Sequence, residues 1–245
     1  MQLYFVRHGQ SFNNALPNDA ARKDDPELTE MGRNQAESVA KHLAESNNID
    51  EYASLEANDP ARKQAIPYGI THLYCSPMKR ALETAQPIAQ ALDLKSVVHL
   101  DMYEFGGVFL ERNGMTTALG GMTRDEMLAE FPNVVLPHTI TEAGWYDVAL
   151  GRERIAHSMG RAIAFAREMT VRANKLDHQD DKIVIVSHGG FIAFTLKAFT
   201  NTLPSFAYMV KHYNTAITRV NFHSDRPLEI MYMNRVNHLS PELIT

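Results

Sequence analysis

Two histidines that close apolar runs are the residues of this chain best placed to do chemistry. One residue separates His8, and likewise His188, from a run of four apolar residues, and a glycine follows each histidine. Such runs are typical of buried strands, and open α/β sheets bind ligands at the carboxyl ends of their strands. Arg7 is costly to bury without an anion, and Gly9 lets the backbone approach one closely. The pattern therefore predicts two imidazoles and a cation around one anionic group, which is what phosphoryl transfer requires.

Two further segments carry anion-binding features at the starts of predicted helices. Arg80 falls in the first turn of a helix opened by Ser76-Pro77. A cation there is unfavourable unless an anion lies between it and the positive end of the helix dipole. Ser187-His188-Gly189-Gly190 joins a strand to a helix N-terminus, which is a ready site for an anion. Alone, Arg80 fits a solvated surface arginine, His8 fits a buried histidine bonded to backbone, and a Gly-Gly pair is weak evidence. Together these features favour a phosphate site.

The composition is that of an ordinary globular protein. Of the 245 residues, 44% are hydrophobic and 22% are charged, and the net charge of −5 comes with no run of basic residues, so nucleic-acid binding has no support. No linker divides the chain, and we expect one domain over residues 1–245. The lone Cys75 cannot form an internal disulfide or a multi-cysteine metal site. No apolar run reaches the ~20 residues of a membrane span, so a cytoplasmic protein without a membrane partner is the default expectation.

Strand and helix patterns alternate along the chain. Thr29 is a suitable N-cap for a helix, Thr123 and Glu126 suit the first turn of another, and Pro87 should bend the helix that contains it. Alternation of this kind predicts an α/β fold with a layered, mostly parallel sheet flanked by helices on both faces. We expect strands at residues 1–6, 70–75, 97–100, 183–186, 216–222 and 229–233, helices at 29–44, 76–92, 123–131, 152–175 and 190–199, an insertion loop at about 46–69, and an irregular, glycine-rich cap at about 105–150.

The chain resembles the histidine phosphatase superfamily, also called phosphoglycerate mutase-like. The resemblance covers most of the chain, and its motifs occur in the family's order. They are Arg7-His8-Gly9-Gln10-Ser11 with Asn14, Leu28-Thr29-x-x-Gly32-x-x-Gln35-Ala36, Ser76-Pro77-x-x-Arg80-Ala81-x-x-Thr84-Ala85, Glu104, and Ser187-His188-Gly189-Gly190.

The resemblance implies a covalent mechanism that needs no metal or other cofactor. His8 would attack phosphorus and become a phosphohistidine, and Arg7, Arg80 and His188 would hold the phosphoryl oxygens. Glu104 would protonate the leaving oxygen and then activate water. The remaining residues of the implied phosphate site are Gln10, Ser11, Asn14 and Gly189.

The segment after Glu104 departs from the mutase pattern. Mutases of this superfamily carry a basic, tyrosine-containing stretch there, whereas this chain has Phe105-Gly106-Gly107-Val108-Phe109. The departure favours a phosphatase acting on a small phosphorylated metabolite. A phosphoglycerate-type mutase and a phosphate-ester-binding module with weak turnover remain the alternatives, and a homodimer remains open. Candidate substrate contacts in the cap, each with an ordinary structural alternative, are Arg112, Arg124, His138, Trp145 and Tyr146.

Overall fold

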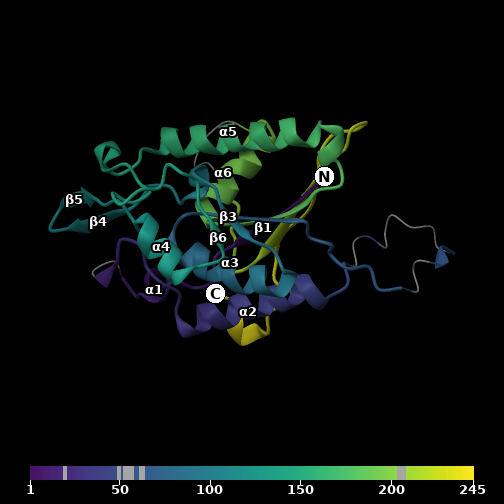
Figure 1. The fold of residues 1–245 in the computed structure, drawn as a ribbon, viewed down its shortest axis with the longest axis horizontal. Helices are drawn as coiled ribbons and strands as arrows, with labels where there is room; N and C mark the ends of the chain where they lie inside the picture. Colours follow the sequence, from purple (N-terminus) through teal and green to yellow (C-terminus); the bar gives the residue numbers. More distant parts are fainter. Residues whose placement is uncertain (19–20, 49–50, 52–57, 61–63, 203–207) are drawn as a thin grey trace.

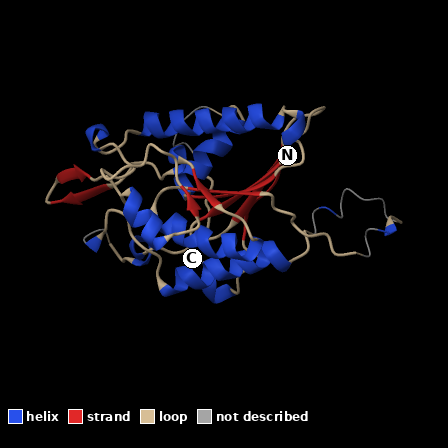
Figure 2. Ribbon diagram, viewed as in Figure 1, coloured by secondary structure: helices blue, strands red, loops and turns tan. Residues whose placement is uncertain are grey.

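A seven-stranded sheet forms the centre of the molecule (Figures 1 and 2). The computed structural model describes residues 1–18, 21–48, 51, 58–60, 64–202 and 208–245. Strands β6, β3, β2, β7 and β1 run parallel, and β8 and β9 extend the sheet antiparallel beyond β1. In sheet order the strands are β6 (Val134–Val135), β3 (Ser96–Val98), β2 (His72–Cys75), β7 (Lys182–Ser187), β1 (Gln2–Arg7), β8 (Ile217–Asn221) and β9 (Glu229–Arg235).

Helices cover both faces of this sheet, which confirms the predicted fold class. Helices α2 (Glu30–Glu45) and α3 (Lys79–Leu92) lie on one face, and α5 (Ile155–Ala173) and α6 (Gly189–Phe199) lie on the other (Figure 1). Alternate residues of β1 therefore enter different cores: Tyr4 packs on the α2/α3 side and Phe5 on the α5/α6 side. Within the described residues, no helix has the length and apolar character needed to cross a membrane.

The helix next to the first motif begins where the sequence predicts. The Thr29 hydroxyl accepts a hydrogen bond from the Gly32 amide and caps α2, and the apolar stripe that includes Val39 and Leu43 is buried. The third helix begins later than expected. Met78 is its N-cap, and the Ser76 hydroxyl accepts a hydrogen bond from the Met78 amide, so Ser76-Pro77 forms the turn before the helix.

Other boundaries differ from the predictions as well. The third strand ends at Val98, because His99 caps a 3-10 turn over Leu100–Met102. Helix α5 starts at Ile155, since Arg152 belongs to the preceding loop and pairs with Glu111. Helix α3 continues through Pro87. The other short helical segments are α1 (Phe12–Ala15), Val148–Leu150, Leu176–His178 and Pro241–Leu243.

The glycine-rich segment 105–150 is more ordered than its composition suggests. It contains a hairpin of β4 (Phe109–Arg112) and β5 (Met115–Ala118), which projects from the end of the sheet where β1 finishes (Figure 1). Helix α4 (Arg124–Glu130) has the predicted capping box, and β6 joins the main sheet. Part of the expected cap is therefore core. Within the expected insertion at 46–69, residues 49–50, 52–57 and 61–63 lie outside the described residues.

The backbone after β1 lies directly against the start of α2. A Cβ atom added at Gly32 would lie 2.1 Å from the Gln10 carbonyl oxygen, and one added at Gly9 would lie 2.4 Å from the Gly32 carbonyl oxygen. Both obstacles are backbone atoms, so a rotamer change cannot relieve the clash. The two glycines therefore set how closely the first turn of α2 supports the loop that carries His8.

The variant Gly32→Ala should lower the free energy of unfolding by about 2 kcal/mol, because overpacking here outweighs the better helix propensity of alanine. Gly160→Ala is the matched control, since Gly160 lies in α5 with nothing within 4 Å of an added Cβ. It should stabilise the protein by roughly 0.5–1 kcal/mol. Urea unfolding of both variants measures the difference, and equal stabilisation by the two would contradict the close approach.

Candidate active site

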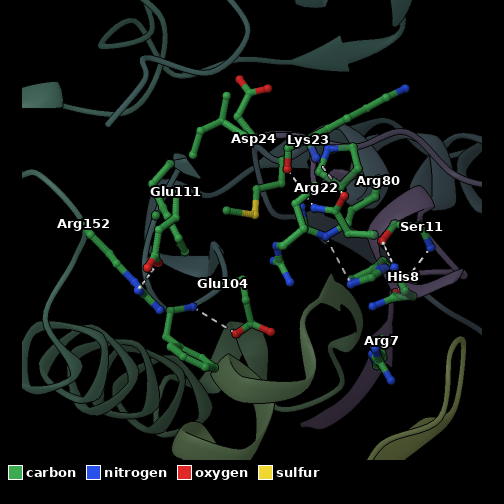
Figure 3. A pocket seen from close by; sticks show the side chains of 18 of the residues that line it. Arg7, His8, Ser11, Arg22, Lys23, Asp24, Arg80, Glu104, Glu111 and Arg152 are labelled. Carbon is green, nitrogen blue, oxygen red and sulfur yellow. Dashed lines mark hydrogen bonds and ion pairs between the residues drawn. The ribbon is translucent and has the colours of Figure 1, made fainter. Parts of the chain in front are cut away.

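A cavity of about 640 Å³ opens at the carboxyl ends of the central strands. Figure 3 shows His8, Arg7 and Arg80 on one side of it and Glu104 facing them. This brings together residues from β1, the start of α3 and the segment after β3. Its lining residues are Arg7, His8, Ser11, Asn13, Asn14, Arg22, Lys23, Asp24, Pro26, Met78, Arg80, Glu104, Phe105, Gly107, Phe109, Leu110, Glu111, Gly114 and Arg152.

The hydrogen bonds of His8 fix its tautomer. Its ring is 3% exposed, and Nδ1 lies 2.6 Å from the Gly9 carbonyl oxygen, which can only accept a hydrogen bond. Nδ1 therefore carries the proton. In the neutral ring Nε2 keeps its lone pair, and it accepts a hydrogen bond from Nε of Arg80 at 3.2 Å. His8 thus presents a nucleophilic nitrogen beside a guanidinium.

Burial and positive charge keep this imidazole neutral. Burial lowers the pKa of His8 well below 6.5, and the Arg80 and Arg7 guanidiniums lower it further. The pKa of His188 is lowered well below 6.5 as well, first by burial and then by Arg80. The two rings lie 5.0 Å apart between centroids. Both imidazoles are therefore neutral, and His8 can attack without first losing a proton.

Two buried nitrogens at this site have no hydrogen-bond partner among the described residues. They are Nε of Arg7 and Nδ1 of His188. The other contacts of these side chains are fixed: Arg7 Nη1 donates to the His212 carbonyl at 2.6 Å, and His188 Nε2 lies 2.7 Å from the Ser76 hydroxyl. If the Ser76 hydroxyl donates, the proton of His188 is on Nδ1. Buried donors left unpaired are costly, and an oxyanion would satisfy them.

Glu104 is held at the start of α6 by backbone amides. Its Oε1 accepts hydrogen bonds from the amides of Phe105 at 3.0 Å and Phe191 at 3.2 Å, and its Oε2 accepts one from Gly190 at 3.2 Å. A Cβ on Gly190 would lie 2.5 Å from Oε1, so glycine is needed for this approach. The carboxylate is partly exposed and lines the cavity, where it can reach a bound ester.

The structure separates the remaining predicted phosphate ligands. Ser11 and Asn14 line the cavity, and the Ser11 hydroxyl also caps α1 by accepting from the Asn14 amide. Gln10 is not among the described lining residues, because its side-chain oxygen accepts from the Thr29 hydroxyl at 2.8 Å. Gly189 does not line the cavity either, but it lies against the Arg7 side chain, where an added Cβ would be 3.6 Å from Nε. The phosphate contacts predicted for Gln10 and Gly189 therefore stay predictions.

Three polar side chains that support His8 or His188 were not predicted. The Asn214 amide donates to the His8 carbonyl at 2.9 Å, and the Thr84 hydroxyl accepts from the Gly9 amide at 3.0 Å. Ser76 contacts His188. Thr84 and Ser76 lie within the quoted motif, which was the available signal. Nothing in the sequence near Asn214 marked it, since it is distant from His8 along the chain.

Asp25 is a further unpredicted member of the site. Its side chain is 8% exposed, lies 3.6 Å from Arg80 Nη1, and accepts hydrogen bonds from the Lys79 amide at both oxygens. Burial raises the pKa of Asp25 to about 6, although Arg80 opposes the shift. Asp25 therefore pairs with Nη1 of the guanidinium whose Nε contacts His8.

The outer cavity is built by residues that the sequence analysis did not assign. Arg152 pairs with Glu111 at 3.1 Å and lies 4.4 Å from the Phe109 ring centroid. By contrast, the predicted cap contacts Trp145 and Tyr146 are buried in the core against Tyr103. The Arg124 guanidinium donates to the Pro137 carbonyl. Among the described lining residues none of the five cap candidates appears: Trp145 and Tyr146 belong to the core, and Arg112 and His138 are exposed away from the lining.

The pKa of Asp25 predicts a pH-dependent stability difference. A folded-state pKa near 6, against 3.8 ordinarily, means that the folded state binds this proton more tightly. The stabilisation is complete below pH 3.8 and is lost as pH rises through about 6. The free energy of unfolding of Asp25→Asn, relative to wild type, should therefore rise by about 2–3 kcal/mol between pH 4 and pH 7. Denaturant unfolding at several pH values checks this, and a constant difference would contradict it.

Comparison with known proteins gives one family and one fold. The model of the histidine phosphatase superfamily (branch 1) matches residues 3–55 and 60–235. YhfR from Bacillus stearothermophilus is 21% identical, with a TM-score of 0.59 over 97% of this chain and 98% of that one. A phosphoserine phosphatase from Entamoeba histolytica is 20% identical, with a TM-score of 0.58 over 98% of this chain and 99% of that one. The ecdysone phosphate phosphatase from Bombix mori is 16% identical, with a TM-score of 0.63 over 98% of this chain and 96% of that one. A search of curated proteins found no match.

Proposed function

The chain belongs to the histidine phosphatase superfamily, and on that premise we propose that it hydrolyses a small phosphomonoester through a phosphohistidine at His8, without a metal. One observation carries the proposal. His8 is neutral, its proton is on Nδ1, and its Nε2 lone pair lies beside Arg80. Unpaired buried nitrogens of Arg7 and His188 complete a set of groups suited to a phosphoryl group.

In the first step, His8 Nε2 attacks phosphorus and the bond from phosphorus to the ester oxygen breaks. As the N–P bond forms, the Arg80 Nε–H stops donating to His8 Nε2 and donates to a phosphoryl oxygen instead. Arg7 and His188 supply further donors to the oxygens on which charge develops. Glu104 acts as the general acid and gives a proton to the leaving oxygen.

In the second step, water attacks phosphorus from the side that the alcohol has left. Glu104, now ionised, accepts the water proton, the N–P bond breaks, and His8 returns to its neutral state. The amides of Phe105, Gly190 and Phe191 keep the carboxylate oriented toward the cavity throughout. The same carboxyl group thus acts first as an acid and then as a base.

The positive charge of the site comes from side chains, which supports the metal-independent form of the proposal. Arg80 is buried and Arg7 is half-buried. Each lies close enough to Glu104 for its carboxylate to raise the arginine pKa, although burial lowers it more. A bound phosphate dianion would pair with these guanidiniums. The cytoplasmic location, the homodimer and the absence of nucleic-acid and membrane partners stay predictions from the sequence.

Three cations at the cavity mouth favour the second candidate, a mutase. Arg22, Lys23 and Arg152 line the outer cavity and could grip a second acidic group of a sugar or glycerate phosphate. However, Arg152 is already paired with Glu111 and stacked on Phe109. A stable phosphoenzyme that transfers to an added phosphoglycerate faster than to water would favour the mutase over the phosphatase.

His8→Ala should abolish phosphate release that wild type sustains in excess chelator, because the covalent step has no other nucleophile. The assay is free phosphate from a panel of monoesters, with His157→Ala as the control, since His157 is exposed on α5. Dependence on added metal would contradict the proposal. Binding of esters without turnover by wild type would instead indicate a binding module.

Glu104→Gln should lower the rate of hydrolysis of alkyl phosphates by about 10²–10⁴-fold, the range of general acid catalysis. The first step for p-nitrophenyl phosphate should change far less, because its leaving group needs no proton. Since glutamine cannot act as the base for water, the phosphoenzyme should accumulate with this substrate and be detectable by acid-labile phosphate on His8. Equal loss with both substrate types, without accumulation, would remove Glu104 from the proposed role.

A further inference from the structure

The segment after β9 returns to the active-site side of the molecule. It contains the short helical turn Pro241–Leu243, which packs on α2 (Figure 1). His238, within this segment, stacks on His42 of α2 with ring centroids 5.4 Å apart. This brings Thr245, which is only partly exposed, between α2 and the loop before β8. None of these contacts involves a group assigned above to the chemistry.

One link from Thr245 runs through Gln35 of α2. Gln35 is fully buried, and its Nε2 donates to the Thr245 hydroxyl at 2.9 Å and to the Leu243 carbonyl at 2.6 Å. Its Oε1 accepts from the Gln10 amide at 2.8 Å. An acceptor is required on the Gln10 side and donors on the other, so the network fixes the orientation of the Gln35 amide.

The second link runs through Asn214, which is 2% exposed. Its backbone amide donates to the Thr245 carbonyl at 2.9 Å, and its Oδ1 accepts from the Thr245 hydroxyl at 3.2 Å. Its Nδ2 donates to the His8 carbonyl at 2.9 Å and to Asn14 Oδ1 at 3.4 Å. The single hydroxyl of Thr245 therefore connects two buried amides, each of which holds the backbone next to His8.

The backbone that these amides hold is the one that orients the imidazole. Gln10 N–H and Gly9 C=O belong to the same peptide group, which is planar. Fixing the N–H against Gln35 therefore fixes the direction of the Gly9 carbonyl. That carbonyl is the acceptor for His8 Nδ1–H at 2.6 Å. A shift of this peptide plane would turn Nε2 away from the place where phosphorus must lie.

We infer that Thr245 is a positioning residue for His8, acting through the Gln35 amide and the Gly9-Gln10 peptide to hold the proton on Nδ1 and to aim Nε2. Asn214 fixes the other side of the nucleophile in the same network. The inference deepens the proposed function and rests on it for its kinetic readout. Its structural readout, the tautomer of His8, does not depend on turnover.

The experiment compares Thr245→Val, which removes the hydroxyl at nearly constant shape, with Thr245→Ser, which keeps it. Thr245→Val should lower kcat about tenfold with KM changed by less than about twofold, since the defect is in aim and not in binding. Thr245→Ser should restore kcat. Ser240→Ala is the control, because Ser240 is exposed in the same segment and its hydroxyl bonds only to Glu242 among the described residues.

Nitrogen-15 NMR of histidine-labelled protein supplies the second readout, with His8→Gln used to assign the ring signals. Thr245→Val should shift the His8 signals from a single Nδ1-protonated form toward a mixture, and Thr245→Ser should not. A lower melting temperature with unchanged kcat and unchanged His8 signals would reduce Thr245 to a structural contact and overturn the inference. If wild type releases no phosphate, the proposed function fails and the NMR comparison alone decides the inference. If valine prevents folding, Thr245→Ala carries the same comparison.

Discussion

The hydrogen bond from His8 Nδ1 to the Gly9 carbonyl is the interaction on which the site depends. It decides which nitrogen faces the cavity, and it spans adjacent residues, so the backbone must be held to keep it. The Asn214 side chain holds the His8 carbonyl, the Thr84 hydroxyl holds the Gly9 amide, and the Gln35 side chain holds the Gln10 amide. The paired glycines at 9 and 32 let α2 come close enough for this support. Much of the local structure thus serves the direction of one imidazole.

The charged groups of the site are unevenly placed. Arg80 is buried and Arg7 is half-buried beside a neutral imidazole. The carboxylates of Asp25 and Glu104 both raise the pKa of Arg80, although burial lowers it more. Asp25 lies outside the cavity contact and fixes Arg80, whereas Glu104 lies in the cavity and is held by amides. The carboxylates therefore divide their work: one positions a cation, and the other is available to a substrate.

The outer part of the cavity is built differently from the part around His8. It is formed by the β4–β5 hairpin and by Arg152, whose nearest contacts are an exposed carboxylate and an aromatic ring. The similar structures are named for phosphoserine, glucosyl-3-phosphoglycerate and ecdysone phosphate. Proteins of one fold thus carry names with unlike esters, as expected where function resides in sites built on a shared fold.

The sequence by itself determined the parts of this protein whose cause is local. Apolar runs ending in Arg7-His8 and Ser187-His188, the Thr29 cap and the capping box at Thr123 each carry their own signal. Most of the strands and most of the helices could therefore be predicted, and the candidate phosphate residues could be named. Tertiary structure alone decided that Asp25, Asn214 and Thr245 support the site and that Trp145 belongs to the core. These residues act through contacts between segments far apart in the chain, and a hydrogen bond across such a distance leaves no periodicity or spacing to read.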